Sequence, residues 1–151
     1  MTDPHPFGGP HTSVQAHNKG RIPKRESNHV PPKSVYEGSP YAGDVSEGKM
    51  PAHSILYTDH RVDKGAAGDG ATGTGSSHVA KQYRLELKAL MNAGKFAEAM
   101  AYDIRDLQNT HGIDFSYYNK GLGQTANYAR ETGLIDENGY ILVINQIFGR
   151  G

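Results

Sequence analysis

The chain has 151 residues, with sixteen basic and sixteen acidic side chains, eight histidines and no cysteine. This length corresponds to one domain with a single core. Because the charges balance, the whole chain lacks the net positive charge typical of nucleic-acid-binding proteins. Any basic surface that binds nucleic acid must therefore be local. The lack of cysteine excludes a disulfide framework, a cysteine-ligated zinc site and a thiol nucleophile, which leaves His, Asp, Asn and Glu for metal or acid–base chemistry.

No apolar run approaches the roughly 20 residues that span a bilayer, and the N-terminus lacks the apolar core of a signal peptide. We therefore expect a soluble protein with no membrane partner.

Residues 1–75 hold most of the glycine and proline and show no sustained apolar period. We predict a flexible tail over 1–20 and a loop-rich, irregular half over 21–75 with a possible short hairpin. The run GAAGDGATGTG at 65–75 should be mobile. Apolar residues in the middle of this half indicate that it is held against the rest of the chain: Val30, Val35, Tyr36, Ile55, Leu56 and Tyr57.

From Ser76 the apolar residues recur at helical spacing. The pattern predicts one helix from Ser76 to Gly94, a second over 95–112 and a third over about 115–132. Residues 136–151 contain an Asn-Gly pair and a β-prone run, which predicts a terminal strand or strap. The expected fold is α+β and mainly α, with the irregular half packed on about three C-terminal helices in one domain over 21–151.

Most side chains of the helical half have an ordinary structural interpretation. Methionine and aromatic stripes at this spacing are core in most proteins. His78 and His111 stand at a helix start and a helix end, where capping or exposure is the usual role. Asp103, Arg105 and Asp106 share one turn, so we expect a solvated face with an ion pair there.

Candidate chemistry concentrates in the first half. Asn28 and His29 place an amide oxygen beside an imidazole, and the prolines after Val30 fix the backbone there in an extended form. MPAHSILYTDHR then supplies a second group, namely His53, Asp59 and His60. Two such groups could converge on one divalent cation, with one imidazole free to take a proton from water. The alternative is that His29 and His60 only bond to backbone in turns.

A basic segment, KGRIPKR, directly precedes Asn28 and His29. Basic side chains beside a metal site suit a phosphodiester substrate. Its residues Lys24 and Arg25, together with Lys33 and Arg61, are therefore candidate substrate-binding residues. A solvated basic segment is the competing interpretation.

Several motifs, taken in order, resemble one known family. They are GGPH at 8–11, SNHVPPKSV, MPAHSILYTDHR, GTGSS, YRLELKALMNAGKFAEAMAYDIRDLQ and YARETGLI. They resemble a C-terminal toxin module of bacterial polymorphic toxins, including Rhs-type proteins, which belongs to the HNH/endonuclease VII group. The resemblance runs from about Gly8 to Ile135. Relatives carry a histidine where this chain has Asn28.

The resemblance implies an antibacterial toxin with a degenerate ββα-metal site that hydrolyses target-cell DNA. His29 would be the general base, while Asn28, Asp59 or His60 would hold the metal. His53 would be a further ligand or orient one, and His60 could also be catalytic. An amide oxygen at Asn28 favours Mg²⁺ or Mn²⁺ over Zn²⁺. Arg61 would clamp a phosphate.

The resemblance also implies partners outside the chain: DNA or RNA as substrate, a cognate immunity protein and a larger carrier that delivers the module into the target-cell cytoplasm.

Two other functions remain open at this stage. One is a metal-independent RNase toxin that uses His29 and His60 as an acid–base pair, with the RNA 2′-hydroxyl as nucleophile. The other is a non-enzymatic binding module with a flexible arm.

Overall fold

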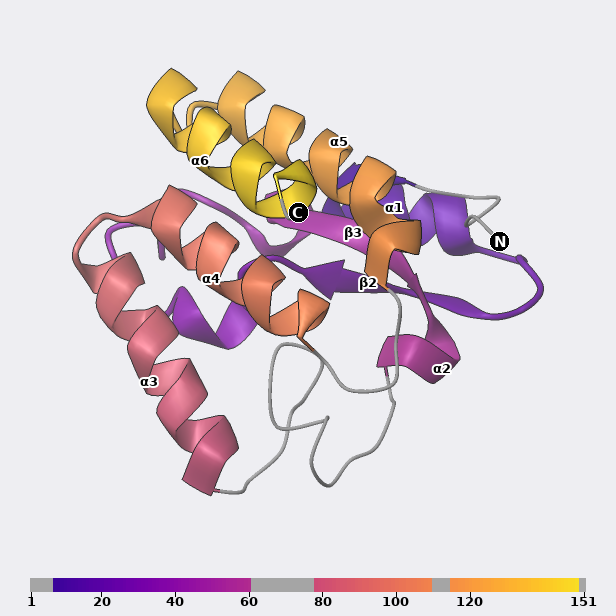
Figure 1. The fold of residues 1–151 in the computed structure, drawn as a ribbon, viewed down its shortest axis with the longest axis horizontal. Coiled ribbons are helices and arrows are strands. Elements are labelled where there is room, and N and C mark those ends of the chain that lie inside the picture. Colours follow the sequence, from indigo (N-terminus) through magenta and orange to yellow (C-terminus); the bar gives the residue numbers. More distant parts are fainter. Residues whose placement is uncertain (1–6, 61–77, 110–114, 150–151) are drawn as a thin grey trace.

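The computed structural model describes residues 7–60, 78–109 and 115–149, and it confirms a mainly helical α+β fold. The described residues form three strands and six α-helices, with short 3₁₀ turns between some of them (Figure 1). The strands are β1 (Gly8–Pro10), β2 (Arg25–His29) and β3 (Pro51–Leu56). The helices are α1 (His11–Asn18), α2 (Tyr57–His60), α3 (His78–Asn92), α4 (Phe96–Gln108), α5 (Asn119–Glu131) and α6 (Glu137–Phe148). The 3₁₀ turns are η1 (Lys33–Val35), η2 (Glu47–Lys49) and η4 (Phe115–Tyr118).

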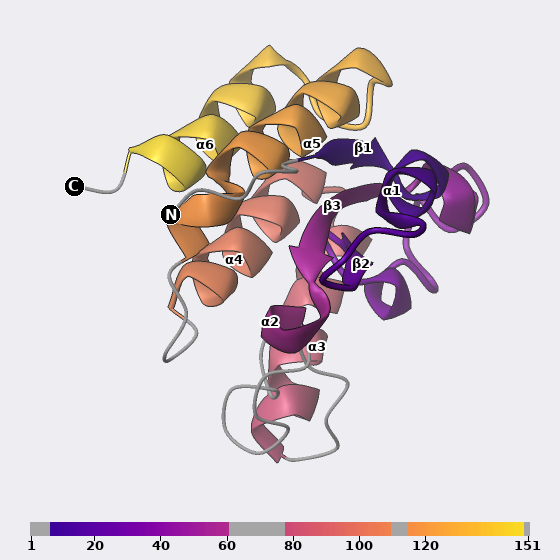
Figure 2. The same cartoon turned by 90° about the vertical axis from the view of Figure 1, so that its right-hand side faces the viewer.

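The sheet has the order β1-β3-β2, and both pairings are antiparallel. The central strand β3 is buried over its first five residues, because β1 and β2 flank it and helices cover it. The short helix α1 packs on one side of the sheet, and α5 packs against β1 and β3 on the side of the helical half (Figure 2). In place of the possible short hairpin, the structure has an antiparallel pair, β2 and β3, whose long connection runs through residues 30–50.

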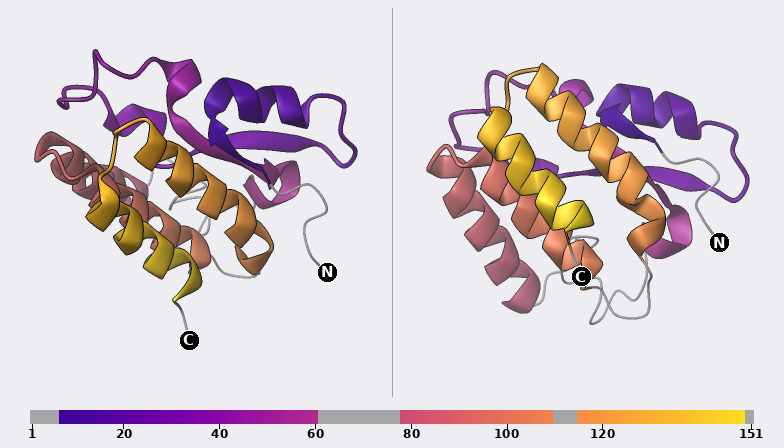
Figure 3. Two further views of the ribbon diagram at one scale, coloured as in Figure 1. Left: turned by 90° about the horizontal axis from the view of Figure 1, so that it is seen from above. Right: turned by 45° about the horizontal axis from the view of Figure 1, so that its top comes forward.

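The helical half follows the predicted apolar periods. In α4 the predicted stripe Phe96, Met100, Ile104 and Leu107 is buried, with at most 2% of each residue exposed. This helix lies between α3 and α6, and α6 also packs on α5 (Figure 3). Gly94 ends the first of these helices with a positive φ of 75°, a conformation that glycine adopts without strain.

The connection over 30–50 belongs to the core. Val30, Val35 and Val45 are buried in it, and the rings of Tyr36 and Tyr41 meet the Phe96 ring edge-on at centroid distances of 5.8 and 4.9 Å. This agrees with the prediction that apolar residues hold the middle of the N-terminal half. The run at 65–75, predicted to be mobile, lies outside the described residues.

Two predicted elements differ. Residues 8–18 were expected in a flexible tail but form β1 and α1, because β1 adds to the sheet edge through its pairing with β3. Residues 137–148 form the helix α6 and not a strand or strap. The Asp136 side chain accepts a hydrogen bond from the Gly139 amide at 2.7 Å and caps the helix, and Val143 and Ile147 face the core at helical spacing.

Asp103 is also not on a solvated face. Its side chain is fully buried, and the Tyr83 hydroxyl donates a hydrogen bond to its Oδ1. Burial raises the pKa of Asp103 well above the usual value of an aspartate. Within the described residues, no helix is both long enough and apolar enough to cross a membrane.

Candidate metal centre

Three side chains from separate segments converge at one end of the sheet. They are His11 at the start of α1, His29 at the end of β2, and Glu47 in η2. One possible ligand atom from each lies within 4.8 Å of the corresponding atoms of the other two. Two imidazoles and one carboxylate form a donor set typical of transition-metal sites.

The central strand brings these residues together. The strands β1 and β2 lie on opposite edges of β3, where Pro10 pairs with Pro51 and His29 pairs with Ala52. The His11 amide donates to the Met50 carbonyl at 3.0 Å, so both histidines sit beside the start of β3. The turn η2, which carries Glu47, immediately precedes the same point of the chain.

Hydrogen bonding orients the imidazole of His11. Its Nδ1 shares a hydrogen bond of 2.8 Å with the Ser27 hydroxyl, which leaves Nε2 facing Glu47 Oε2 at 4.0 Å. The rings of His11 and His29 stack with centroids 4.1 Å apart. The Nε2 atom of His29 is buried and has no hydrogen-bond partner within the described residues. A buried ring nitrogen of this kind is the atom that a metal would satisfy.

The electrostatics suit metal binding at neutral pH. Burial, followed by the nearby His11, lowers the pKa of His29 to about 4. Burial also lowers the pKa of His11, against the opposing influence of Glu47. A hydrogen bond from Lys33 lowers the pKa of Glu47, and the Lys33 Nζ lies 2.9 Å from Oε1. At pH 7 the site therefore offers two neutral imidazoles and an ionised carboxylate.

This donor set fits a divalent transition metal. Metal ligation requires neutral imidazole and ionised carboxylate, which is the protonation state found here. Three protein ligands that leave a position open are characteristic of catalytic sites. Because imidazole suits zinc, iron or copper better than magnesium, these residues fit Zn²⁺ or a similar ion better than the Mg²⁺ or Mn²⁺ expected from Asn28.

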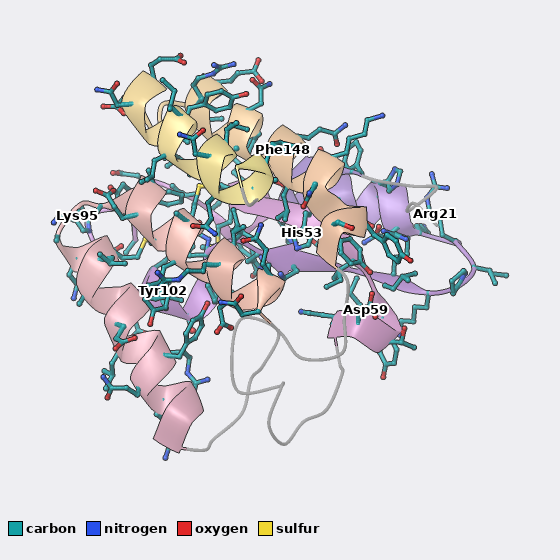
Figure 4. The ribbon with its side chains drawn as sticks, in the orientation of Figure 1. Arg21, His53, Asp59, Lys95, Tyr102 and Phe148 are labelled. Atoms are coloured by element: carbon teal, nitrogen blue, oxygen red, sulfur yellow. The ribbon has the colours of Figure 1, made fainter. Side chains whose placement is uncertain are left out.

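Asn28 and His29 do not point to the same place, because successive residues of a strand face opposite sides of the sheet. His29 faces α1, whereas Asn28 faces the helical half. There the Asn28 side-chain amide donates to His53 Nε2 at 3.1 Å. His53 is fully buried against the Tyr118 ring, and burial lowers its pKa to about 3. These two predicted ligands therefore form a buried pair within the sheet. Figure 4 labels His53 in the interior of the molecule.

Asp59 and His60 lie in α2, at the other end of β3 from His29. Asp59 accepts a hydrogen bond from the Tyr118 hydroxyl, and His60 Nδ1 bonds to Glu26 Oε1 at 2.7 Å. Glu26 and His29 are three positions apart in β2, which corresponds to roughly 10 Å along the strand. Glu26 and His29 also face opposite sides of the sheet. The structure therefore does not bring His29 and His60 together as an acid–base pair.

The predicted substrate-binding residues that the structure describes also lie in different places, and only one of them is at the metal centre. Lys33 stands at the centre through its ion pair with Glu47. Lys24 lies at the far end of β2 with its Nζ 4.7 Å from the centre of the Tyr57 ring. Arg25 is buried, and its Nε donates to the Ser54 hydroxyl at 2.6 Å, so it stabilises the sheet. Arg61 lies outside the described residues.

Sequence reasoning did not select His11 or Glu47. His11 is part of the GGPH motif. A histidine directly after the turn-like sequence Gly-Gly-Pro could have been chosen as a candidate ligand. Glu47 stands in the run SEGK, which has no feature that distinguishes it from an ordinary surface glutamate.

Comparisons with protein-family profiles, with curated proteins and with solved structures each found no significant match to this chain.

Proposed function

We propose that the chain is a metal-dependent endonuclease of the bacterial toxin type, with His11, His29 and Glu47 as its metal ligands. The observation that carries the proposal is the convergence of these three side chains in the protonation state that a metal requires. The resemblance to polymorphic toxin modules supplies the reaction class, hydrolysis of phosphodiesters in a target cell. A cognate immunity protein and a delivering carrier belong to the same proposal.

Each residue of the centre has a defined task. A bound divalent ion would supply Lewis-acid chemistry, lowering the pKa of water and polarising a phosphoryl oxygen. Ser27 fixes the ring of His11 through Nδ1, as outer partners of metal ligands commonly do. His29, with a pKa of about 4, is a weak proton acceptor at pH 7. We therefore assign His29 to ligation rather than to the general base.

Lys33 supports phosphate as the substrate group. Its side chain is 58% exposed and is held at the centre by Glu47. An ammonium beside a metal ligand can bind a phosphate oxygen and offset charge that develops on it. Lys49, two residues after Glu47 in η2, adds a second exposed basic side chain on this edge.

The test combines metal binding with cleavage. Titration of the purified chain with Zn²⁺, Mn²⁺ and Mg²⁺ should show one site, and plasmid DNA should be cut with a metal and spared with EDTA. Glu47 is exposed, so Glu47→Gln should leave the fold intact while weakening metal binding and cleavage together. Glu37→Gln is the matched control, because Glu37 is an exposed glutamate of the same 30–50 segment.

The outcomes separate the candidate functions. Cleavage of RNA that survives EDTA would favour the metal-independent RNase. Absence of metal binding, or equal binding by Glu47→Gln and Glu37→Gln, would refute the proposed centre.

A further inference from the structure

The loop over residues 19–24, which joins α1 to β2, carries the most exposed large apolar side chain of the described residues. Ile22 is 93% exposed, whereas the next, Leu85 in α3, is 61% exposed. The loop projects from one end of the molecule, away from the helical half (Figure 3). Single exposed apolar residues are common on proteins, so the surroundings of Ile22 decide whether it has a role.

The backbone holds this loop in place. On the side of α1, the Arg21 amide donates to the Asn18 carbonyl at 3.1 Å, and its Nε donates to the His17 carbonyl at 2.6 Å. On the side of β2, the Lys24 carbonyl accepts from the Tyr57 amide at 2.9 Å. Gly20, with a φ of 76°, makes the turn possible. Ile22 is thus presented at the tip of a loop anchored on both sides.

The flanks of Ile22 are basic. Lys19, Arg21 and Lys24 surround it in sequence, and Lys19 and Lys24 are exposed. The exposed residues of the neighbouring helix α1 carry no acidic group: they are Thr12, Ser13, Gln15 and Ala16. A polyanion that follows α1 therefore meets cationic side chains at the loop and no opposing charge on the exposed residues of the helix. At the other end of α1, Lys33 forms an ion pair with Glu47.

We propose that the 19–24 loop is a DNA-binding wedge, in which Ile22 inserts between stacked bases while its basic neighbours contact the phosphates. The proposal rests on the proposed function for its choice of polyanion. Apolar wedges such as isoleucine and proline, flanked by Lys and Arg, are the means by which minor-groove proteins unstack a base step. Pro23 directly follows Ile22 and is itself exposed.

The size of the apolar tip favours DNA over a lipid surface. Even a whole myristoyl chain gives only marginal membrane binding, and Ile22 contributes far fewer carbons. One aliphatic side chain is, in contrast, sufficient to part a base step.

The wedge and the metal centre can engage one duplex. They lie at opposite ends of α1, whose eight residues span roughly 12 Å at about 1.5 Å per residue. The length of α1 alone corresponds to about three to four base-pair steps of 3.4 Å, and Ile22 lies four residues beyond the end of this helix.

The experiment measures binding in EDTA, so that its result does not depend on cleavage. The probe is a duplex of about 20 base pairs with 2-aminopurine, whose fluorescence rises when the base unstacks. Ile22→Ala should weaken duplex binding about tenfold, because it removes aliphatic carbon that the bases would bury, and should abolish the fluorescence rise. Leu85→Ala, the matched control on α3, should behave as the wild type. Lys19→Gln should lower the slope of log affinity against log salt by about one.

Three results would overturn the wedge: equal binding and fluorescence for Ile22→Ala and Leu85→Ala, no duplex binding by the wild type, or an effect of Ile22→Ala on anionic phosphatidylserine vesicles and not on the duplex. Duplex binding that depends on Ile22 in a chain that cuts no DNA would uphold the wedge and refute the proposed nuclease function.

Discussion

The close approach of β1 to α5 predicts that a single methyl group at Gly8 disturbs both the fold and the metal centre. A Cβ at Gly8 would lie 2.0 Å from the Gly121 carbonyl oxygen and 2.2 Å from the Thr125 hydroxyl. Relief of this contact requires β1 and α5 to separate by about 1 Å, and overpacking of this kind costs about 1–3 kcal/mol. For a chain of this size 1 kcal/mol lowers Tm by about 2–4 °C. Gly8→Ala should therefore lower Tm by about 2–12 °C.

The same displacement should reach the metal centre, because His11 follows β1 directly. A shift of His11 by about 1 Å separates it from His29 and Glu47, so metal affinity should fall along with Tm. The measurements are thermal unfolding and metal titration by calorimetry. Gly43→Ala is the control, since a Cβ there meets nothing within 4 Å. If Gly8→Ala matched Gly43→Ala in both measurements, the docking of β1 on α5 would not be what positions His11.

Three further predictions follow from individual contacts. Lys33→Met should tighten metal binding, because it removes the ammonium that competes with the metal for Glu47. The same change should slow DNA cleavage, because it removes a phosphate-binding group. If metal affinity and cleavage fell together, these two roles of Lys33 would be contradicted. Asp103→Asn should flatten the pH dependence of the free energy of unfolding, measured with urea, above about pH 4, the ordinary pKa of an aspartate. The raised pKa of Asp103 stabilises the wild type at low pH, and that contribution is lost as pH rises toward the folded pKa. Leu122→Ala, at a fully buried site, should cost about 2–5 kcal/mol in urea unfolding; a loss below 1 kcal/mol would argue against the packing of α5.

The helical half could be predicted well because its signals are local. Apolar residues at helical spacing and the glycine stop at Gly94 place α3 (His78–Asn92) and α4 (Phe96–Gln108) inside the predicted ranges 76–94 and 95–112, although α4 ends at Gln108. The run after Asp136 misled, because Ile, Leu and Val favour strands when taken alone. The run forms a helix because Asp136 caps it and because Val143 and Ile147 are buried where α6 packs on α4 and α5. Strand propensity reports neither of these contacts.

The candidate site was predicted less well for a reason of geometry. The prediction assumed that the side chains of neighbouring residues bind the same metal. Neighbouring side chains can do so in a turn, but in a strand they face opposite sides of the sheet. Once residues 25–29 form β2, Asn28 and His29 must separate to opposite faces of the sheet. The pairing of Asn28 with His53 then becomes a feature of the core, and only His29 remains on the side of α1.

The position of the metal centre follows from the sheet rather than from any motif. The start of β3 has a neighbour on each side, and the residues that reach it there are His11 from one edge and His29 from the other. Glu47 joins them because η2 leads into β3 with a single residue, Met50, between them. These three positions are far apart in sequence, and their proximity depends on strand order β1-β3-β2. A sheet with β2 in the centre would place Glu47 and His11 at separate edges, so the strand order itself is what assembles the ligands.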